Sequence, residues 1–370
     1  MVDFNKEIDV ENIDITYIHD KDQSEFKKLS GNKILITGAG GFLGYYFIKS
    51  ILAWNDKNLN KLIELTVLSS FRKGIPDWIL SLAKRTDFKI IKNNIASFKL
   101  DKNLSFDYIV HAASIASPTF YRLFPIETIN ANVKGLYNIL DYLVIKKNIK
   151  NPVKGLLYFS SSEIYGDPLP GNIPTPEDYR GNVSCTGPRA CYDESKRFCE
   201  TLCVNYSRAY KLPIKVARPF NNYGPGMKIT DGRVIADFSK NILDNTDIIM
   251  YSNGSPSRTF CYVADAIVGY LKILINGRNG EAYNVGVESP EISIKSLAEK
   301  MVNIGKKNFG YKGRIIMKES ADREYLTDNP NRRCPNIGKA RRELGYSPKI
   351  SLDEGLYGVL HWYKNIYYKS

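Results

Sequence analysis

Tyr192 and Lys196 are the residues whose types and spacing point most directly to chemistry. Residues four apart on a helix lie on one face, so we expect the Lys196 ammonium beside the Tyr192 phenol. A free tyrosine loses its proton near pH ~10, and an adjacent cation lowers that pKa toward the working range. A phenolate beside a bound dinucleotide can take a proton from a hydroxyl while hydride leaves the same carbon. The pair therefore predicts redox chemistry on an alcohol.

A glycine-rich turn upstream gives this pair its context. The turn follows the apolar run 33–37, which is typical of a buried strand, and precedes a helix expected over 42–54. Glycine lets the backbone approach a pyrophosphate, and the start of the helix supplies amide donors. We therefore expect a dinucleotide to bind at this turn, and the residues assigned to it are Gly38, Gly41, Phe42, Leu43 and Gly44.

The end of the second expected strand departs from the usual dinucleotide pattern. An acidic side chain commonly stands there and binds the ribose hydroxyls. Here the strand over 65–68 continues into Ser69, and Arg72 and Lys73 follow without any Asp or Glu. Either Arg72 or Lys73 binds a 2′-phosphate, or Ser69 bonds the ribose and the basic side chains are solvated. The missing acid leaves NADP open as the cofactor.

Strands and helices alternate along the first part of the chain. Strands are expected over 33–37, 65–68, 88–91, 108–110, 155–159 and 214–217, and long helices over 126–145 and 192–210. This order predicts a Rossmann-type α/β fold, a doubly wound parallel sheet that binds ligands at the carboxyl ends of its strands. Ala112 and Ser114 follow the fourth strand at that edge, so both are assigned to the cofactor site, and Ser160 begins another such strand end.

Three regions are predicted from composition. Residues 1–30 are charged and weakly periodic, and are expected to form an appended N-terminal arm with a short helix over 23–29. Residues 31–220 form the dinucleotide-binding domain. Proline and glycine become frequent beyond that point, so 221–370 is expected to be a smaller α/β substrate-binding lobe, with an approximate boundary that segments of either region can cross.

Bulk composition excludes several classes of function. The 370 residues are 43% hydrophobic, but no apolar run approaches the ~20 residues of a membrane span, and the N-terminus does not resemble a secretory signal. The net charge is +13, yet the lysines are dispersed and no nucleic-acid recognition motif accompanies them. Six scattered cysteines and three histidines give no metal set, and they favour reduced thiols in the cytoplasm.

Several stretches together carry a family resemblance. From Asn32 to the C-terminus the chain resembles the extended short-chain dehydrogenases/reductases that act on nucleotide sugars, and among them most resembles the UDP-glucuronate decarboxylases, which make UDP-xylose. The stretches that carry it are Ser160-Ser-Ser-Glu-Ile-Tyr-Gly-Asp-Pro168, Gly187-Pro-Arg-Ala-Cys-Tyr-Asp-Glu-Ser-Lys-Arg197, Asp231-Gly-Arg-Val234 and Asn331-Arg-Arg-Cys-Pro335. The resemblance implies NAD as the cofactor and a homodimer built on the two long helices.

The resemblance also implies a reaction and roles for named residues. Tyr192 takes the proton from the sugar O4, hydride leaves C4, and the resulting β-keto acid loses carbon dioxide before hydride returns. Matched positions near the sugar are Ser161, Ser162, Glu163 and Arg333, and matched positions for the rest of the substrate are Asn221, Arg233 and Arg258. An arginine suits the diphosphate because its guanidinium forms paired hydrogen bonds to phosphate.

Departures from the family pattern keep other functions in view. Ser69 and Asn94 stand where acids are usual, and Gly226 stands where the decarboxylases usually have arginine. A 4,6-dehydratase needs an Asp–Glu pair, and Ser162 occupies the Asp position. A 4-epimerase would leave Glu163 without a task. A non-catalytic NAD(P)-binding scaffold would need neither Tyr192 nor its lysine.

Overall fold

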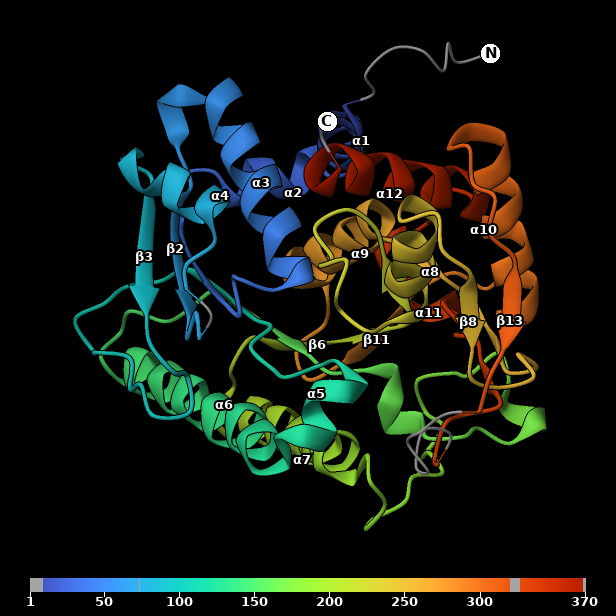
Figure 1. Ribbon diagram of the computed structural model, residues 1–370. Coiled ribbons are helices and arrows are strands. Elements are labelled where there is room, and N and C mark those ends of the chain that lie inside the picture. The colour runs from blue at the N-terminus through green and yellow to red at the C-terminus, as the bar shows by residue number, and fades with distance from the viewer. Residues whose placement is uncertain (1–8, 73, 320–326, 369–370) are drawn as a thin grey trace.

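A seven-stranded parallel sheet forms the centre of the molecule (Figure 1), and the computed structural model describes residues 9–72, 74–319 and 327–368. The strand order is β11-β6-β5-β4-β1-β2-β3, and every neighbouring pair is parallel. The strands are β1 (Lys33–Thr37), β2 (Glu64–Ser69), β3 (Phe88–Lys92), β4 (Tyr108–His111), β5 (Gly155–Phe159), β6 (Ile214–Pro219) and β11 (Ala282–Val285). The chain reverses its direction of travel across the sheet between β1 and β4, which is where such folds open a ligand crevice.

Helices cover both faces of this sheet. On one face lie α3 (Phe42–Lys57) and α9 (Val263–Asn276), and on the other lie α6 (Pro125–Asn148) and α7 (Ala190–Tyr210), with the short α5 (Pro118–Leu123) beside them (Figure 1). Alternate residues of β1 enter separate cores, because successive side chains of a strand point to opposite faces. Ile34 and Ile36 pack under α3 and α9, while Leu35 packs under α6 and α7. The doubly wound fold expected from the alternating pattern is confirmed.

The N-terminal region is a packed layer rather than the appended arm that its composition suggested. Its described part forms α1 (Val10–Lys21) and α2 (Gln23–Leu29), of which only the second was expected. Ile18 and Phe26 have no exposed surface, and α1 packs against α3, α9 and α12 (Leu352–Tyr367). The apolar signal of α1 is weak because acidic and tyrosine side chains occupy part of its buried face.

The C-terminal part of the chain contributes smaller elements around one end of the sheet. These are α8 (Val234–Leu243), α10 (Ile294–Asn308), α11 (Gly338–Leu344), the pair β7 (Asn222–Tyr223) and β10 (Cys261–Tyr262), the pair β8 (Ile248–Met250) and β13 (Ile315–Met317), and the small sheet of β9 (Ser257–Arg258), β12 (Ile292–Ser293) and β14 (Arg332–Arg333). The remaining short elements are α4 (Asp77–Leu80), η1 (Leu59–Lys61), η2 (Ser81–Lys84), η3 (Ser162–Tyr165) and η4 (Pro170–Asn172).

Segments from beyond residue 220 also complete the central sheet. Strand β11 pairs with β6, and α9 covers the face shared with α3. The two predicted lobes are therefore interleaved in the chain, and the boundary near 220 stays a prediction. In the described ranges, no helix is both long enough and apolar enough to traverse a lipid bilayer. All six cysteines carry free thiols.

Candidate active site

A cavity of about 690 Å³ opens at the carboxyl ends of the central strands. The glycine turn, the ends of β2, β4 and β5, the start of α7 and parts of the C-terminal region line it. All residues assigned to a site from the sequence lie on its wall, namely Gly38, Gly41, Phe42, Leu43, Gly44, Ser69, Arg72, Ala112, Ser114, Ser161, Ser162, Glu163, Tyr192, Lys196, Asn221, Arg233, Arg258 and Arg333. The fold thus brings them together, and their individual roles stay predictions.

The glycine turn has the shape that a pyrophosphate needs. Gly38 has φ +76°, and a Cβ there would lie 2.7 Å from the carbonyl atoms of Ala112 at the end of β4. Gly44 is equally confined, because its Cβ would lie 2.7 Å from the Ala39 oxygen. Helix α3 starts at Phe42 with Gly41 as its N-cap, and no side chain caps its amides. Its first N–H groups are therefore available to a phosphate, which fits a bound dinucleotide.

The ribose end of the cavity lacks acidic side chains, as the sequence indicated. Ser69 ends β2, and Arg72 and Asn94 line the wall beyond it. Lys73, the alternative partner for a 2′-phosphate, lies outside the described residues. The only carboxylates among the described lining residues are Glu163 and Asp231, and neither belongs to this end.

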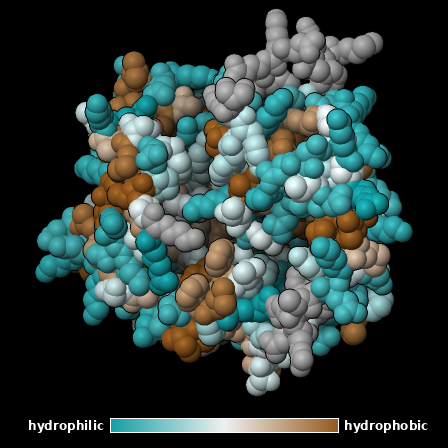
Figure 2. Space-filling view, viewed as in Figure 1, coloured by the Kyte–Doolittle hydropathy of each residue, from teal (hydrophilic) through white to brown (hydrophobic). Residues whose placement is uncertain are grey.

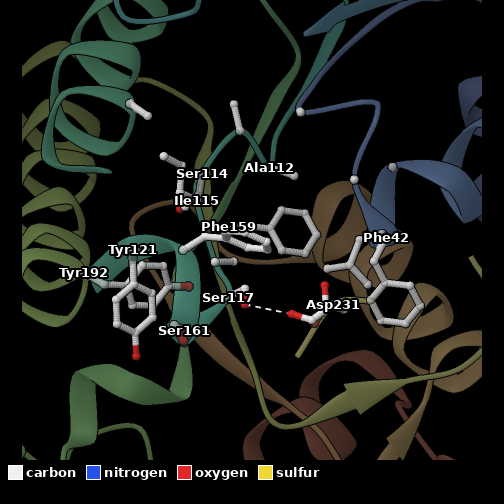
Figure 3. A pocket seen from close by; sticks show the side chains of 18 of the residues that line it. Phe42, Ala112, Ser114, Ile115, Ser117, Tyr121, Phe159, Ser161, Tyr192 and Asp231 are labelled. Carbon is white, nitrogen blue, oxygen red and sulfur yellow. Dashed lines mark hydrogen bonds between the residues drawn. The ribbon is translucent and has the colours of Figure 1, made fainter. Parts of the chain in front are cut away.

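Tyr192 and Lys196 are both buried on α7, with 6% and 2% of their surface exposed. The Lys196 ammonium lies 5.7 Å from the centroid of the Tyr192 ring and donates to the Phe159 carbonyl oxygen at 2.7 Å. The ring of Tyr121 stacks on the Tyr192 ring, with centroids 5.0 Å apart and planes inclined by 14°. Figure 3 shows the two rings face to face beside Ser161.

The pKa of Tyr192 moves in the opposite direction to the one expected from Lys196. Burial raises the pKa of Tyr192, and a hydrogen bond with Ser161 lowers it only in part. Burial also lowers the pKa of Lys196 to about 8. The prediction took into account only the Lys196 ammonium. Removing the phenolate from water destabilises it by more than a cation at this distance stabilises it. Ser161, rather than Lys196, makes the direct contact that favours the phenolate.

Glu163 is enclosed by guanidinium groups at the far end of the cavity. Ser161 caps the short helix η3 by accepting from the Glu163 amide at 3.2 Å, and this bond orients the segment. The Glu163 carboxylate forms ion pairs with Arg189 and Arg333. Burial alone would raise the pKa of Glu163, but Arg189 and Arg333 outweigh it and lower the pKa to about 2. This carboxylate is therefore ionised at neutral pH.

The sequence-based assignment missed three residues of this cluster. Arg189 and Tyr121 line the cavity, and Asp193 packs behind them with 4% of its surface exposed. Arg189 and Asp193 flank Tyr192 within the stretch that carries the family resemblance, so the stretch held a signal. No spacing rule links Arg189 to Glu163, because their contact joins the start of α7 to the short helix η3.

A smaller cavity of about 260 Å³ adjoins the first. Asn221, Arg233 and Arg258 line both cavities and so stand at their junction. Arg258 is held in place by its donors, which bond the carbonyl oxygens of Ser257 at 2.7 Å and Pro330 at 2.6 Å. Two fixed guanidinium groups between two cavities suit a diphosphate that joins a nucleoside to a second group.

Gly226 departs from the decarboxylase pattern for a visible steric reason. Its φ is +84°, and a Cβ there would lie 2.8 Å from Cδ1 of Tyr45. The position lines the larger cavity, and Tyr45 on α3 fills the adjacent space. A longer side chain at 226 would need Tyr45 to move, so the two residues are matched to each other.

Known proteins share this fold and this sequence pattern. The pattern of the NAD dependent epimerase/dehydratase family matches residues 34–286. UDP-glucuronic acid decarboxylase 5 of Arabidopsis thaliana is 35% identical over 327 residues, covering 88% of this chain and 88% of that protein. A dTDP-glucose 4,6-dehydratase from Streptomyces venezuelae, solved with NAD bound, has a TM-score of 0.74 at 25% identity and covers 90% of this chain and 97% of its own. UDP-glucuronic acid 4-epimerase from Bacillus cereus, solved in complex with UDP-glucuronic acid and NAD, has a TM-score of 0.72 at 24% identity. The match covers 90% of this chain and 100% of that chain, and it shows a shared fold.

The family match spans more than half of the chain, and the plant decarboxylase is similar over nearly its whole length. Both agree with the glycine turn, the buried Tyr192–Lys196 pair and the parallel sheet described above. The protein is therefore an enzyme of the NAD dependent epimerase/dehydratase family, with UDP-glucuronic acid decarboxylases among its relatives.

Proposed function

We propose that this enzyme converts UDP-glucuronate to UDP-xylose and carbon dioxide through a 4-keto intermediate, with its NAD reduced and reoxidised within one cycle. The observation that carries the proposal is the Glu163 carboxylate held between Arg189 and Arg333 beside Ser162. The names of its relatives support the same reaction, since several are UDP-glucuronic acid decarboxylases.

The charge of the larger cavity supports an anionic substrate. Its described basic lining residues are Arg72, Arg189, Lys196, Lys228, Arg233, Arg258 and Arg333, whereas its carboxylates are Glu163 and Asp231. A nucleotide sugar carries a diphosphate, and a uronic acid adds a carboxylate on the sugar. Buried cations in excess are stabilised when such an anion enters, because the pairing offsets their desolvation.

Tyr192 and Ser161 supply the proton chemistry at the sugar O4. A bound NAD, held at the turn of Gly38, Gly41 and Gly44, would supply the capacity to take up hydride from C4 and give it back. The Ser161 hydroxyl lowers the pKa of Tyr192, so it favours the phenolate that forms when the O4 proton is taken. The buried Lys196 ammonium adds positive charge on the same helix face. The proton that Tyr192 removes returns to O4 when the ketone is reduced.

Loss of carbon dioxide follows from the ketone at C4. A carboxylate on C5 is then β to the ketone, so the C5–carboxylate bond breaks and its electron pair forms an enolate that includes C4. A proton added to C5 restores the ketone, which is then reduced. Arg333 is the cation proposed to position the carboxylate, and Glu163 the group proposed to order the sugar or relay the C5 proton through water.

Two other reactions pass through the same 4-keto intermediate and differ in the step that follows it. A 4,6-dehydratase needs an acid to protonate the leaving hydroxyl, and the buried Ser162 stands at that position with no ionisable group. A 4-epimerase would reduce the ketone from the other face and retain the carboxylate. A binding scaffold would have no use for a buried Tyr192 with Ser161 and Lys196 beside it on the cavity wall.

Mass spectrometry of the products decides among these reactions. The purified enzyme with NAD is incubated separately with UDP-glucuronate, UDP-glucose and dTDP-glucose. Decarboxylation removes carbon dioxide from UDP-glucuronate, dehydration removes water from a hexose, and epimerisation leaves the mass unchanged. Inert UDP-glucuronate together with water loss from either glucose nucleotide would overturn the proposal.

The cofactor is proposed to be NAD, supported by the family pattern. Arg72 at the acid-free end of the cavity leaves NADP as the competitor, because a guanidinium there can bind a 2′-phosphate. Releasing the bound nucleotide from denatured protein identifies which one is carried. Titration of Arg72→Ser with both cofactors then tests the arginine, since only NADP binding should weaken if it contacts the phosphate.

A homodimer is proposed from the surface of α6 and α7. Figure 2 shows apolar side chains gathered on the surface over α5 and the start of α6. Ile126 is 64% exposed, Ile129 is 38% exposed, and Phe198 on α7 is 46% exposed. A two-fold interface would bury these side chains. Sedimentation that finds a monomer at all concentrations would contradict it. The cytoplasmic location expected from the cysteines stays a prediction.

A further inference from the structure

Arg189 occupies a position that connects the two cavities to the reacting tyrosine. It precedes Tyr192 by three residues at the start of α7, lines both cavities, and has 8% of its surface exposed. Its guanidinium carbon lies 5.9 Å from the centroid of the Tyr121 ring, which stacks on Tyr192. One aromatic ring therefore separates this cation from the phenol that handles the O4 proton.

The distance between these groups matches the chemistry of an acidic sugar. The carboxylate of a uronic acid is attached to C5, the direct neighbour of the C4 that carries the reacting oxygen. Any cation that binds this carboxylate must therefore lie close to Tyr192 without touching O4. Arg189 meets that condition because it lies beside Tyr121, the ring that stacks on Tyr192. It also forms an ion pair with Glu163, which pairs with Arg333 as well.

The bonds that Arg189 already makes leave it capacity for a further anion. Among the residues that the structure describes, its Nε has no hydrogen-bond partner, and the buried Nε of Arg333 has none either. A second carboxylate, that of Asp193, places its Oδ2 3.7 Å from Arg189 Nε, beyond hydrogen-bonding distance. Burial and the charge of Glu163 raise the pKa of Asp193 to about 7, so Asp193 holds a proton readily and competes weakly for the arginine.

A third buried guanidinium shows the same surplus of positive charge. Arg258 lies close enough to feel both Arg189 and Arg333, and burial together with these neighbours lowers its pKa to about 9. Buried like charges are unfavourable unless an anion joins them. The Glu163 carboxylate neutralises part of this positive charge, and a ligand carboxylate would neutralise more of it.

We propose that Arg189 is a specificity-determining residue that selects a carboxylate on the sugar, acting with Arg333 beside Tyr192. This inference rests on the proposed function, because it assigns a second cation to the same substrate group. It goes further in predicting that selection of the acidic sugar is separable from recognition of the nucleotide. The fork of a guanidinium can hold Glu163 with one edge and the ligand with another.

Paired ligands test the assignment directly. UDP-glucuronate and UDP-xylose share the nucleotide and differ at C5 by the carboxylate, so the ratio of their dissociation constants reports carboxylate recognition. Calorimetry is done on NAD-loaded protein that also carries Tyr192→Phe, so that UDP-glucuronate binds without being turned over. Adding Arg189→Gln to this background should weaken UDP-glucuronate by about tenfold or more, and UDP-xylose by less than about threefold, as expected for losing one charged hydrogen bond.

A matched control separates this effect from general loss of charge or structure. Arg197 lies two turns further along α7, donates to the carbonyl oxygens of Ile164 and Arg180, and lines neither cavity. Arg197→Gln should leave the ratio unchanged. Should Arg189→Gln not fold, Arg189→Lys keeps a charge opposite Glu163 but loses the planar fork, and the dissociation constant of UDP-glucuronate should still rise about threefold relative to that of UDP-xylose.

The outcomes distinguish this inference from the function on which it rests. An unchanged ratio in the Arg189 variants, or an equal loss for both ligands, overturns the role of Arg189 even if carbon dioxide is released. A ratio that depends on Arg189 in an enzyme that releases no carbon dioxide supports the inference and rejects the decarboxylase. In the latter case a reaction that keeps the carboxylate, such as epimerisation, would take its place.

Discussion

The carboxyl groups of two clusters in this enzyme have pKa values shifted in opposite directions. In the cavity, Arg189 and Arg333 outweigh burial and lower the pKa of Glu163 to about 2. Beneath α1, the partners of Asp14 are hydroxyl groups, since it accepts from Tyr46 at 2.5 Å and Tyr262 at 2.9 Å. There burial prevails and raises the pKa of Asp14 to about 7.

The difference shows that burial alone does not decide whether a carboxylate is charged. Both groups are largely shielded from water, and tyrosine hydroxyls lower the pKa of Asp14 too little to offset its burial. Asp22 follows the same rule, because burial raises its pKa to about 8 although the Lys272 ammonium is 3.1 Å away. Guanidinium groups keep a permanent anion in the active site, whereas the N-terminal layer is held by carboxyl groups that take up protons near neutrality.

Replacing a tyrosine in each cluster should produce the largest contrast. Tyr192→Phe removes the group that exchanges the O4 proton, so turnover should fall by ~10² or more with little change in substrate affinity. Tyr46→Phe removes one hydrogen bond to Asp14 and should lower stability while turnover remains near normal. Steady-state kinetics and cofactor titration of both variants check this. Near-normal turnover in Tyr192→Phe would remove that residue from the mechanism.

Neutralising Glu163 tests how much its ion pairs with the two arginines stabilise the fold. Glu163→Gln leaves Arg189 and Arg333 without their shared anion, and breaking a buried pair costs about 3 kcal/mol of unfolding free energy. Urea unfolding at neutral pH measures that loss. Added UDP-glucuronate should recover part of it, because the ligand carboxylate returns an anion to the cluster. A variant as stable as the wild type would show that the ion pairs contribute little.

The sequence predicted the sheet well because its strands are short apolar runs bounded by turn residues. Lys33–Thr37 and Gly155–Phe159 have the same bounds in the structure as in the expectation, and the other expected strands differ by one or two residues at their ends. Helix α1 was missed since acids and tyrosines, which normally indicate an exposed surface, occupy its buried side. Asp14 and Tyr17 are examples, each hydrogen-bonded to a residue more than two hundred positions away.

The candidate site was predictable where a local motif has a fixed place in the fold. Gly38 and Tyr192 belong to such motifs, and the structure brings both to one cavity. Arg189 was missed because its importance depends on Glu163, which lies 26 residues earlier in the chain and in another element. The direction of the Tyr192 pKa shift was also beyond the sequence, because burial of the phenol depends on the packing of Tyr121 and the whole cavity wall.

Stability as a function of pH should reveal the N-terminal cluster through Asp14. Because burial raises its folded pKa from 3.8 to about 7, the folded state binds a proton more tightly than the unfolded state between these values. The contribution of Asp14 is therefore present at low pH and is lost as pH rises through this window, with a slope of at most about 1.4 kcal/mol per pH unit. Asp14→Asn cannot titrate, so its unfolding free energy should fall less steeply from about pH 5 to about pH 7, and the two slopes should agree above about pH 8.

Urea unfolding of both proteins across this range isolates Asp14 from its titrating neighbours. Glu11 and Asp265 also act on Asp14, but both are present in each protein and largely cancel in the difference. Glu163 should add nothing to the slope in this window, since it remains ionised throughout. Parallel curves for wild type and Asp14→Asn would mean that the carboxylate beneath α1 is already charged at mild pH. The tyrosine hydroxyls would then stabilise the ionised Asp14 carboxylate, as the two arginines stabilise that of Glu163. The two clusters would no longer differ in the direction of their pKa shifts.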